Sequence, residues 1–153
     1  MYPSGFYCEV KYDGERLMAH MARDRTVSFF SRQGKTPPEH KTAGLADALR
    51  LAFPNASELI VDSEVVMRAP DGTVLPFGAQ GVHEQKKHAG ATCCLLAFDL
   101  LHLDGSDLTQ LPLRKRRAAL EGALVPQRHR VELSSCRLMS TAAELASAFA
   151  ESE

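Results

Sequence analysis

Residues 6–16 read Phe6-Tyr-Cys-Glu-Val-Lys-Tyr-Asp-Gly-Glu-Arg16, a run in which aromatic and β-branched residues give way to an Asp-Gly pair. This composition predicts a strand over Phe6–Tyr12, followed at once by a tight turn. The same run places Lys11 at the end of the strand and Arg16 five residues further on. The primary amine of Lys11 is therefore expected to lie beside the cationic side chain of Arg16.

Further strands and helices are expected on the C-terminal side of this run. Strands over 16–20 and 27–31 would continue an antiparallel meander, and a hairpin turn at 70–72 would join strands over 59–67 and 74–77. A central strand over 92–103, buried on both faces, and a strand near 131–133 complete the set. Apolar residues at helical spacing predict helices over 42–53 and 112–124, and a last helix with Ser140 as its N-cap and Glu144 in its first turn. Consecutive short strands without intervening helices indicate an α+β fold.

The composition limits the classes of function. The 153 residues, 44% of them hydrophobic and 24% charged, are enough for one globular domain with a core. With 18 Lys and Arg against 19 Asp and Glu, the net charge of −1 excludes binding to nucleic acid by bulk charge alone. No apolar run approaches the roughly 18 residues of a membrane span, and the first residues lack the layout of a secretory signal, so we expect an intracellular protein.

The four cysteines are Cys8, Cys93, Cys94 and Cys136, and they include no Cys-x-x-Cys pair. Reduced thiols are therefore expected. Cys93 and Cys94 are adjacent on a predicted strand, where successive side chains point to opposite faces, so the pair is poorly placed to bind one zinc ion.

Lys11 is a candidate nucleophile. A lysine amine attacks only when it is neutral, and its free pKa of about 10.4 leaves on the order of one molecule in a few thousand neutral at pH 7. Burial, neighbouring cations or a bound divalent ion lower that pKa, and full correction to pH 7 requires roughly 4 to 5 kcal/mol. One arginine is not expected to supply this.

The motif Lys11-Tyr-Asp-Gly-Glu-Arg16 resembles the lysine signature of the ATP-dependent DNA ligases, which share a covalent nucleotidyltransferase superfamily with RNA ligases and mRNA capping enzymes. Three further segments follow in the family's order, namely Phe30-Ser-Arg32, Asp62-Ser-Glu-Val65 and Phe98-Asp-Leu-Leu-His-Leu-Asp-Gly105. Two others, Pro76-Phe-Gly-Ala-Gln-Gly-Val-His83 and Pro112-Leu-Arg-Lys-Arg-Arg117, are similar to the DNA ligase III branch in particular. The resemblance covers nearly all of the chain. It implies antiparallel and mixed sheets flanked by helices, in the nucleotidyltransferase (ATP-grasp-like) core of covalent ligases.

The resemblance also implies roles for individual residues. Lys11 would attack the α-phosphorus of ATP, giving a lysyl-AMP and releasing pyrophosphate, with Mg²⁺ as the metal. AMP would pass to the 5′-phosphate of nicked double-stranded DNA, and the 3′-hydroxyl would then seal the nick. The remaining roles are adenine recognition by Glu9, contacts to ribose and phosphate from Arg16 and Arg32, a carboxylate near the ribose and the metal from Glu64, and stacking on the purine by Phe98.

Simpler interpretations of these residues remain open. Lys11 could be a solvated lysine at a strand end, Glu64 could only pair across a sheet, and Phe98 could be an ordinary core aromatic. Asp99 is given no role. The basic run 114–117 could contact a DNA backbone, although for Arg114 and Lys115 a solvated helix face is the favoured interpretation.

The family pattern continues with a Glu-Gly-(Leu/Val/Ile)-(Val/Met)-x-Lys segment and a Lys-x-Lys segment, and neither full pattern is found in residues 1–153. We therefore expect this chain to be the N-terminal three-quarters of one adenylation domain, without the OB-fold and helical DNA-binding domains, and poorly soluble alone. The resemblance implies a role in DNA repair, recombination and replication, and a nuclear or alternatively mitochondrial location.

Two other functions are carried as alternatives. An RNA ligase or a GTP-using capping enzyme would share the lysine chemistry, but Tyr12, the Glu15-Arg16 pair and the segment around Phe77-Gly78 argue against it. A non-catalytic module that binds a nucleotide or a DNA end would bind ATP without forming a covalent adenylate.

Overall fold

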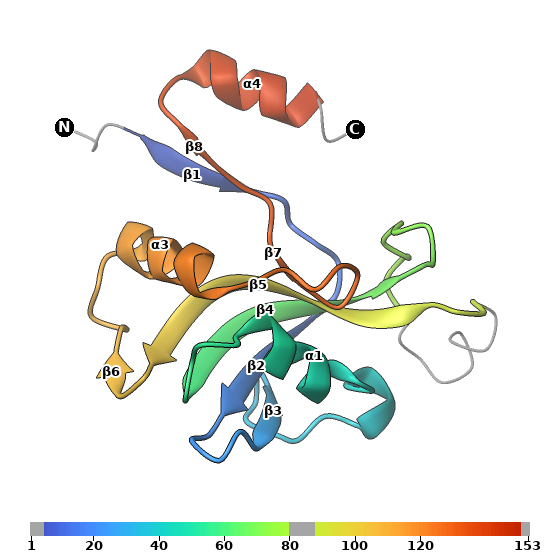
Figure 1. Ribbon diagram of the computed structural model, residues 1–153. Helices are drawn as coiled ribbons and strands as arrows, with labels where there is room; N and C mark the ends of the chain where they lie inside the picture. Colours follow the sequence, from blue (N-terminus) through green and yellow to red (C-terminus); the bar gives the residue numbers. More distant parts are fainter. Residues whose placement is uncertain (1–4, 80–87, 151–153) are drawn as a thin grey trace. The chain divides into compact units, whose positions relative to one another are not determined.

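The computed structural model describes residues 5–79 and 88–150, and it confirms a mixed α+β fold (Figure 1). The elements, in chain order, are β1 (Phe6–Glu9), β2 (Glu15–Met21), β3 (Val27–Ser31), the 3-10 helix η1 (Glu39–Lys41), α1 (Leu45–Ala52), β4 (Leu59–Arg68), β5 (Thr92–Leu103), β6 (Ser106–Asp107), α3 (Leu113–Ala123), β7 (Val131–Leu133), β8 (Cys136–Met139) and α4 (Ala142–Ala150). They fall into two compact units. The larger is residues 13–133, and the smaller joins residues 1–12 to 134–153.

The larger unit is built on a six-stranded sheet. The strand order is β3-β2-β4-β5-β6, and β7 pairs with β5. β5 and β7 run parallel, whereas the other pairs are antiparallel. The predicted strands over 27–31, 92–103 and 131–133 have the observed bounds. β5 lies inside the sheet and is mostly buried, as its continuous apolar sequence predicts.

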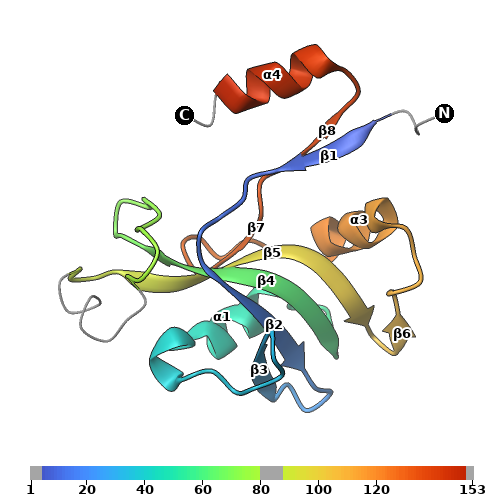
Figure 2. The same ribbon diagram turned by 180° about the vertical axis from the view of Figure 1, so that it is seen from behind.

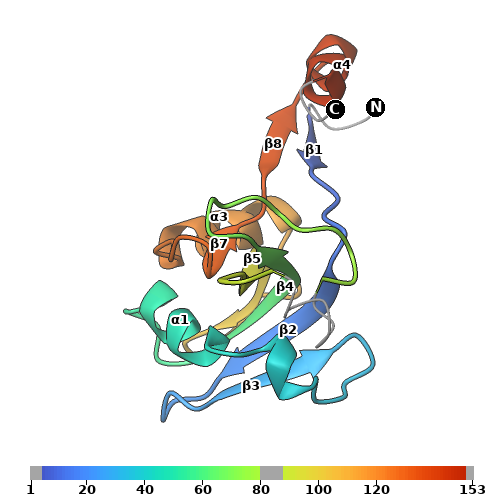
Figure 3. The same ribbon diagram turned by 90° about the vertical axis from the view of Figure 1, so that its right-hand side faces the viewer.

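Helices α1 and α3 cover one face of this sheet (Figure 3). Strand β2 shows why that face is apolar, because alternate residues Leu17, Ala19 and Met21 are buried against the helices. The largest fully buried side chains of the unit include Leu45, Leu49, Phe53, Leu59, Leu95, Leu100 and Leu120. Arg16 and Met18 lie on the opposite face of the sheet. Figure 2 shows the molecule from behind, with this face toward the viewer.

The register between β4 and β5 shifts at two places, and the shift at Phe98 changes which residues of β5 face the core. Asp99 is opposite Asp62 and Ala97 is opposite Ser63, so Phe98 is an extra residue without a partner on β4. Such a β-bulge bends the strand and redirects its side chains. Ala97 and Leu100 both belong to the core although they are three positions apart. Phe98 and Asp99 are therefore both diverted away from the core.

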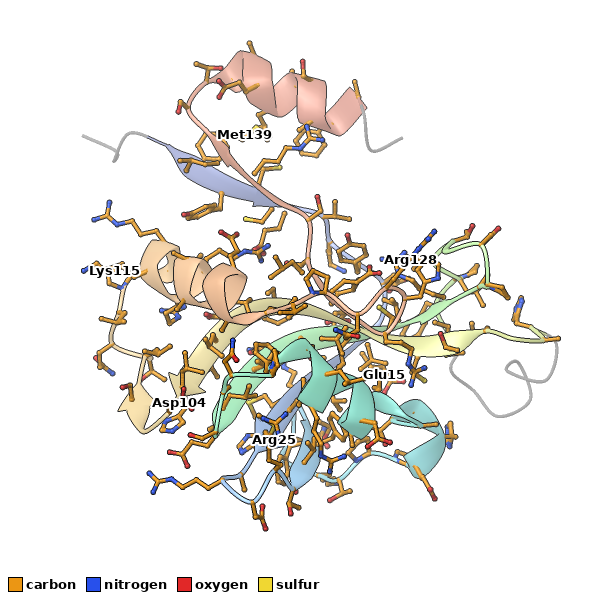
Figure 4. The ribbon with its side chains drawn as sticks, viewed as in Figure 1. Glu15, Arg25, Asp104, Lys115, Arg128 and Met139 are labelled. Carbon is orange, nitrogen blue, oxygen red and sulfur yellow. The ribbon has the colours of Figure 1, made fainter. Side chains whose placement is uncertain are left out.

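The end of α1 is capped by an arginine from the turn after β2. Arg25 has a positive φ of 64° and donates from Nη1 to the carbonyl of Ala56 at 2.8 Å and from Nη2 to that of Arg50 at 2.6 Å (Figure 4). A further bond from Nη1 reaches the carbonyl of Phe53 at 3.3 Å. The last carbonyls of a helix lack partners within it, and this guanidinium satisfies that of Arg50 in the last turn of α1, together with those of Phe53 and Ala56 after the helix.

The smaller unit contains an antiparallel pair, β1 and β8, and helix α4. The predicted meander is wrong for its first strand, because β1 pairs with β8 and not with β2. The Asp13-Gly14 signal reflects a close approach rather than a hairpin, since a Cβ on Gly14 would lie 2.3 Å from the Val65 carbonyl oxygen of β4.

Two other local predictions need correction, and one strand was missed. The N-cap of α4 is Thr141, not Ser140, because Thr141 Oγ1 accepts from the Glu144 amide at 3.2 Å while a Glu144 carboxylate oxygen accepts from the Thr141 amide at 3.1 Å. The predicted strand over 74–77 is reduced to a bridge between Arg68 and Val74, where Pro76 lacks the amide needed to continue a ladder. Strand β8 was not predicted.

Residues 80–83 of the segment Pro76–His83 lie outside the described residues. In the ranges 5–79 and 88–150, no helix combines the length and the apolar character needed to cross a bilayer.

Candidate functional site

Arg16 is the centre of a polar cluster on the open face of the sheet. From β2, its Nε donates to both carboxylate oxygens of Asp62 on β4, at 3.0 and 3.2 Å, and its Nη2 also bonds Asp62 Oδ2. The side chain of Asp62 is only 4% exposed, whereas that of Arg16 is 50% exposed. This hydrogen bonding to Asp62 raises the pKa of Arg16, and the negative charges of Glu64 and Asp99 act in the same direction. Asp62 therefore holds the charged guanidinium of Arg16 in one orientation, and the exposed part of that side chain can contact a ligand.

The ring of Phe98 lies beside this cation. The Cζ atom of Arg16 is 5.8 Å from the ring centroid, a cation–π distance. Phe98 is half-buried and is not a member of the core cluster formed by the described residues. The β-bulge explains this position, and the structure therefore differs from the core-aromatic interpretation of Phe98.

Arg32 joins the cluster from the residue that follows β3. Together with Arg16 and Met18 it lines a surface cavity of about 150 Å³. Its side chain is exposed, and the described part of the chain offers it no hydrogen-bond partner. Two guanidinium groups at one cavity are suited to a phosphate, because each can donate two parallel hydrogen bonds.

Glu64 lies on β4 directly opposite Arg16 on β2. The carboxylate is half-buried and raises the pKa of Arg16 through its charge. Arg16, Arg32, Glu64 and Phe98 are thus four predicted site residues that the structure brings together in the larger unit.

The other two predicted residues belong to the smaller unit. Glu9 is the last residue of β1 and pairs with Cys136 of β8. Lys11 follows two residues later, is exposed and lies outside any regular element. The amide of Val10, between them, donates to the carbonyl of Ser135 at 3.2 Å, which extends the pairing of the two chain segments up to the residue before Lys11.

Sequence reasoning missed three polar residues that hold this cluster in place. Asp62 was recognised only as part of a motif, and Asp99 was given no role. Asp99 accepts from Arg116 of α3 at 2.8 Å (Nε to Oδ1) and 2.7 Å (Nη2 to Oδ2). The sequence did contain a signal for Asp99, because it is an acidic residue within an otherwise apolar strand. A buried carboxylate of this kind requires a partner.

The basic run 114–117 divides into two pairs. Arg116 and Arg117 turn toward the protein, where Arg117 is buried and donates to Glu121 at 2.9 Å. Arg114 and Lys115 are exposed, and Figure 4 shows Lys115 at the beginning of α3. The solvated helix face expected for Arg114 and Lys115 therefore does not extend to Arg117, which is buried.

Comparison with known proteins identifies the family. The family model described as the ATP dependent DNA ligase domain matches residues 1–153. The chain belongs to the ATP-dependent DNA ligase family. It is 44% identical over 145 residues to a DNA ligase of Lymantria dispar multicapsid nuclear polyhedrosis virus, covering 94% of this chain and 26% of that protein. It is 37% identical over 144 residues to a DNA ligase of monkeypox virus, with the same two coverages. The chain thus spans about a quarter of the length of these ligases.

Solved structures of ATP-dependent ligases share the fold. A mycobacterial DNA ligase D complexed with ATP and MES matches with a TM-score of 0.66 at 23% identity, over 95% of this chain and 44% of that one. The ATP-dependent DNA ligase of bacteriophage T7, in complex with ATP, matches with a TM-score of 0.52 at 15% identity, over 95% of this chain and 52% of that one. These similarities confirm the ligase nucleotidyltransferase fold predicted from the sequence.

Proposed function

We propose that this chain carries the nucleotide-binding part of an ATP-dependent DNA ligase and that Lys11 accepts AMP. The lone pair of the neutral Lys11 amine would form a P–N bond to the α-phosphorus of ATP. The bond from that phosphorus to the oxygen bridging to the β-phosphate would break, and pyrophosphate would leave with its electrons. The amine proton would pass to solvent. Covalent catalysis of this kind divides a difficult ligation into easier steps.

The observation that supports this most strongly is the Arg16–Phe98–Arg32 arrangement in the larger unit. An aromatic ring offers a stacking surface for a base, and the two arginines at the adjacent cavity offer donors for ribose and phosphate oxygens. Asp62 fixes Arg16 before any nucleotide binds, which reduces the entropy lost on binding.

Glu9 of the smaller unit and Glu64 of the larger unit each have a proposed role. We assign recognition of the adenine edge to Glu9 and a contact near the ribose and the metal to Glu64. Mg²⁺ prefers oxygen ligands and commonly binds through one or two carboxylates together with substrate phosphates, so Glu64 and a triphosphate suit it. Bound there, Mg²⁺ would neutralise charge on the phosphates.

The activity of the whole protein follows from the same proposal. AMP would pass from Lys11 to the 5′-phosphate of nicked double-stranded DNA, and the 3′-hydroxyl would displace it to form the phosphodiester. We further propose affiliation with the DNA ligase III branch, on the segments 76–83 and 112–117, and a role in nuclear DNA repair, recombination and replication.

The test is intact-mass spectrometry of the chain incubated with ATP and Mg²⁺, alongside GTP. We expect the wild-type chain to gain the mass of one AMP with ATP and Mg²⁺ and to gain no mass with GTP. Lys11→Ala should gain no mass with either nucleotide. Labelling by GTP instead would support a capping-type enzyme. Binding of ATP, measured by calorimetry, without any mass gain in wild type would contradict the covalent step and favour a non-catalytic binding module.

A further inference from the structure

The β-bulge at Phe98 is held from outside the sheet by the two arginines at the centre of α3. Arg116 makes the two bonds to the Asp99 carboxylate described above, and its Nη1 donates to the Leu111 carbonyl at 2.6 Å. Arg117 Nη1 reaches the carbonyl of Phe98 itself at 3.5 Å. The bulged residue and the residue after it are thus each bonded to the same helix.

The Asp99 carboxylate also has a local bond that fixes its direction. Its Oδ1 accepts from the amide of Leu100 at 2.9 Å, in addition to Arg116 Nε. The side chains of Asp99 and Arg116 are only 14% and 18% exposed. A bidentate pair shielded to this degree is geometrically specific, because the planar guanidinium matches the carboxylate in one orientation.

Charge gives Arg116 a second effect on the cluster. Asp99 is directly opposite Asp62 across β4 and β5, so two carboxylates face one another on neighbouring strands. Each has its own arginine, Arg16 for Asp62 and Arg116 for Asp99. Without Arg116, the charge of Asp99 would be unneutralised beside Asp62, and like charges directly opposite in a sheet are destabilising.

We infer that Arg116 is a positioning residue, which acts through Asp99 to fix Phe98 for stacking on the base of the nucleotide. Arg116 does not line the cavity formed by Arg16, Met18 and Arg32, and it would act on the ring through Asp99 and the bulge. The inference rests on the proposed function for its ligand, whereas the positioning of the ring is a property of the protein alone.

The first experiment needs no nucleotide. NMR of the chain with labelled phenylalanine would follow the Phe98 ring, assigned with Phe98→Leu, in Arg116→Gln and in the control Arg114→Gln on the exposed side of the same helix. We expect Arg116→Gln to shift the Phe98 ring resonances while those of the buried Phe53 stay in place, and Arg114→Gln to shift neither. An unchanged Phe98 ring in Arg116→Gln would overturn the inference, even if the chain binds no ATP.

The second experiment separates positioning from general damage. Loss of a base–aromatic stack weakens binding about 5- to 150-fold, and we expect Phe98→Ala to weaken ATP binding within this range. Arg116→Gln should weaken ATP binding about three- to tenfold and Arg116→Lys less, and both variants should weaken the binding of inorganic tripolyphosphate by a smaller factor than that of ATP. Adding Arg116→Gln to Phe98→Ala should weaken ATP binding by no more than the factor seen for tripolyphosphate.

Equal weakening of ATP and tripolyphosphate binding would overturn the positioning role, because it would mean that Arg116 supports the whole site. If wild type bound neither ligand, the proposed function would fail, and the ring resonances alone would decide the inference.

Discussion

Replacing Asp62 by asparagine removes the charge that orients Arg16 while leaving one oxygen to accept a hydrogen bond. Breaking a fully buried ion pair costs about 3 to 5 kcal/mol, whereas an exposed pair contributes about 0.2 to 1 kcal/mol. The Arg16–Asp62 pair lies between these limits, since the aspartate is 4% exposed and the arginine 50% exposed. Solvent around the half-exposed arginine reduces the loss, so we expect a coupling free energy of about 1 to 2 kcal/mol.

Urea denaturation of four proteins measures this coupling: wild type, Asp62→Asn, Arg16→Gln and the double variant. With a slope of about 2 kcal/mol/M, Asp62→Asn should lower the midpoint by about 0.5 to 1 M. The double variant should be more stable than the sum of the single effects predicts, because the pair is already broken in each single variant.

The exposed pair Asp47–Arg50 on α1 provides the matched control, with a distance of 2.7 Å and an aspartate that is 85% exposed. Its coupling should be about 0.2 to 0.5 kcal/mol. Equal coupling in the two pairs would refute the argument that burial of Asp62 makes Arg16 a fixed cation.

Three further predictions concern the rest of the larger unit. Arg25→Met should lower the free energy of unfolding by about 1 to 2 kcal/mol in the same urea assay, because three carbonyls at or just after the end of α1 lose their donor. Arg23→Met breaks only an exposed pair with Glu58 and should leave the urea midpoint nearly unchanged. Burial raises the pKa of Cys94 to about 11 and also raises the pKa of Cys93, so less of each thiol is present as the reactive thiolate. Both cysteines should therefore resist alkylation at pH 8 until urea unfolds the protein. Rapid labelling of Cys94 in the native protein, detected by peptide mass mapping, would contradict this. Burial lowers the pKa of His20 in the folded protein, so as the pH falls the imidazole is protonated in the unfolded chain before it is protonated in the folded one. The free energy of unfolding should therefore fall as the pH drops below about 6.5. His20→Gln should reduce this pH dependence of the urea midpoint.

The sequence predicts most elements of the larger unit because their signals are local. The continuous apolar run of β5 and the β-branched run of β4 are typical of buried strands, and the helical spacing before Pro54 identifies α1. The pairing of β1 with β8 was not predictable in this way, because the paired residues Glu9 and Cys136 are 127 positions apart (136 − 9) and a meander of neighbouring strands is the simpler expectation.

The candidate site shows the same division between local and long-range information. The family motifs identified Arg16, Arg32, Glu64 and Phe98, which lie together in the larger unit. The bonds that Asp62 and Arg116 make were not predicted, because their partners are 46 and 17 residues away. The bulge at Phe98 was equally hidden, since it is a property of the register between two strands and not of either sequence alone.

The most direct test of the central claim is tandem mass spectrometry of peptides from the chain after incubation with ATP and Mg²⁺. We expect AMP on the peptide that contains Lys11, localised to that lysine and released by acid, as a phosphoramidate should be. A chain that binds ATP yet carries AMP on another residue, or on none, would contradict the assignment of Lys11 as the nucleophile.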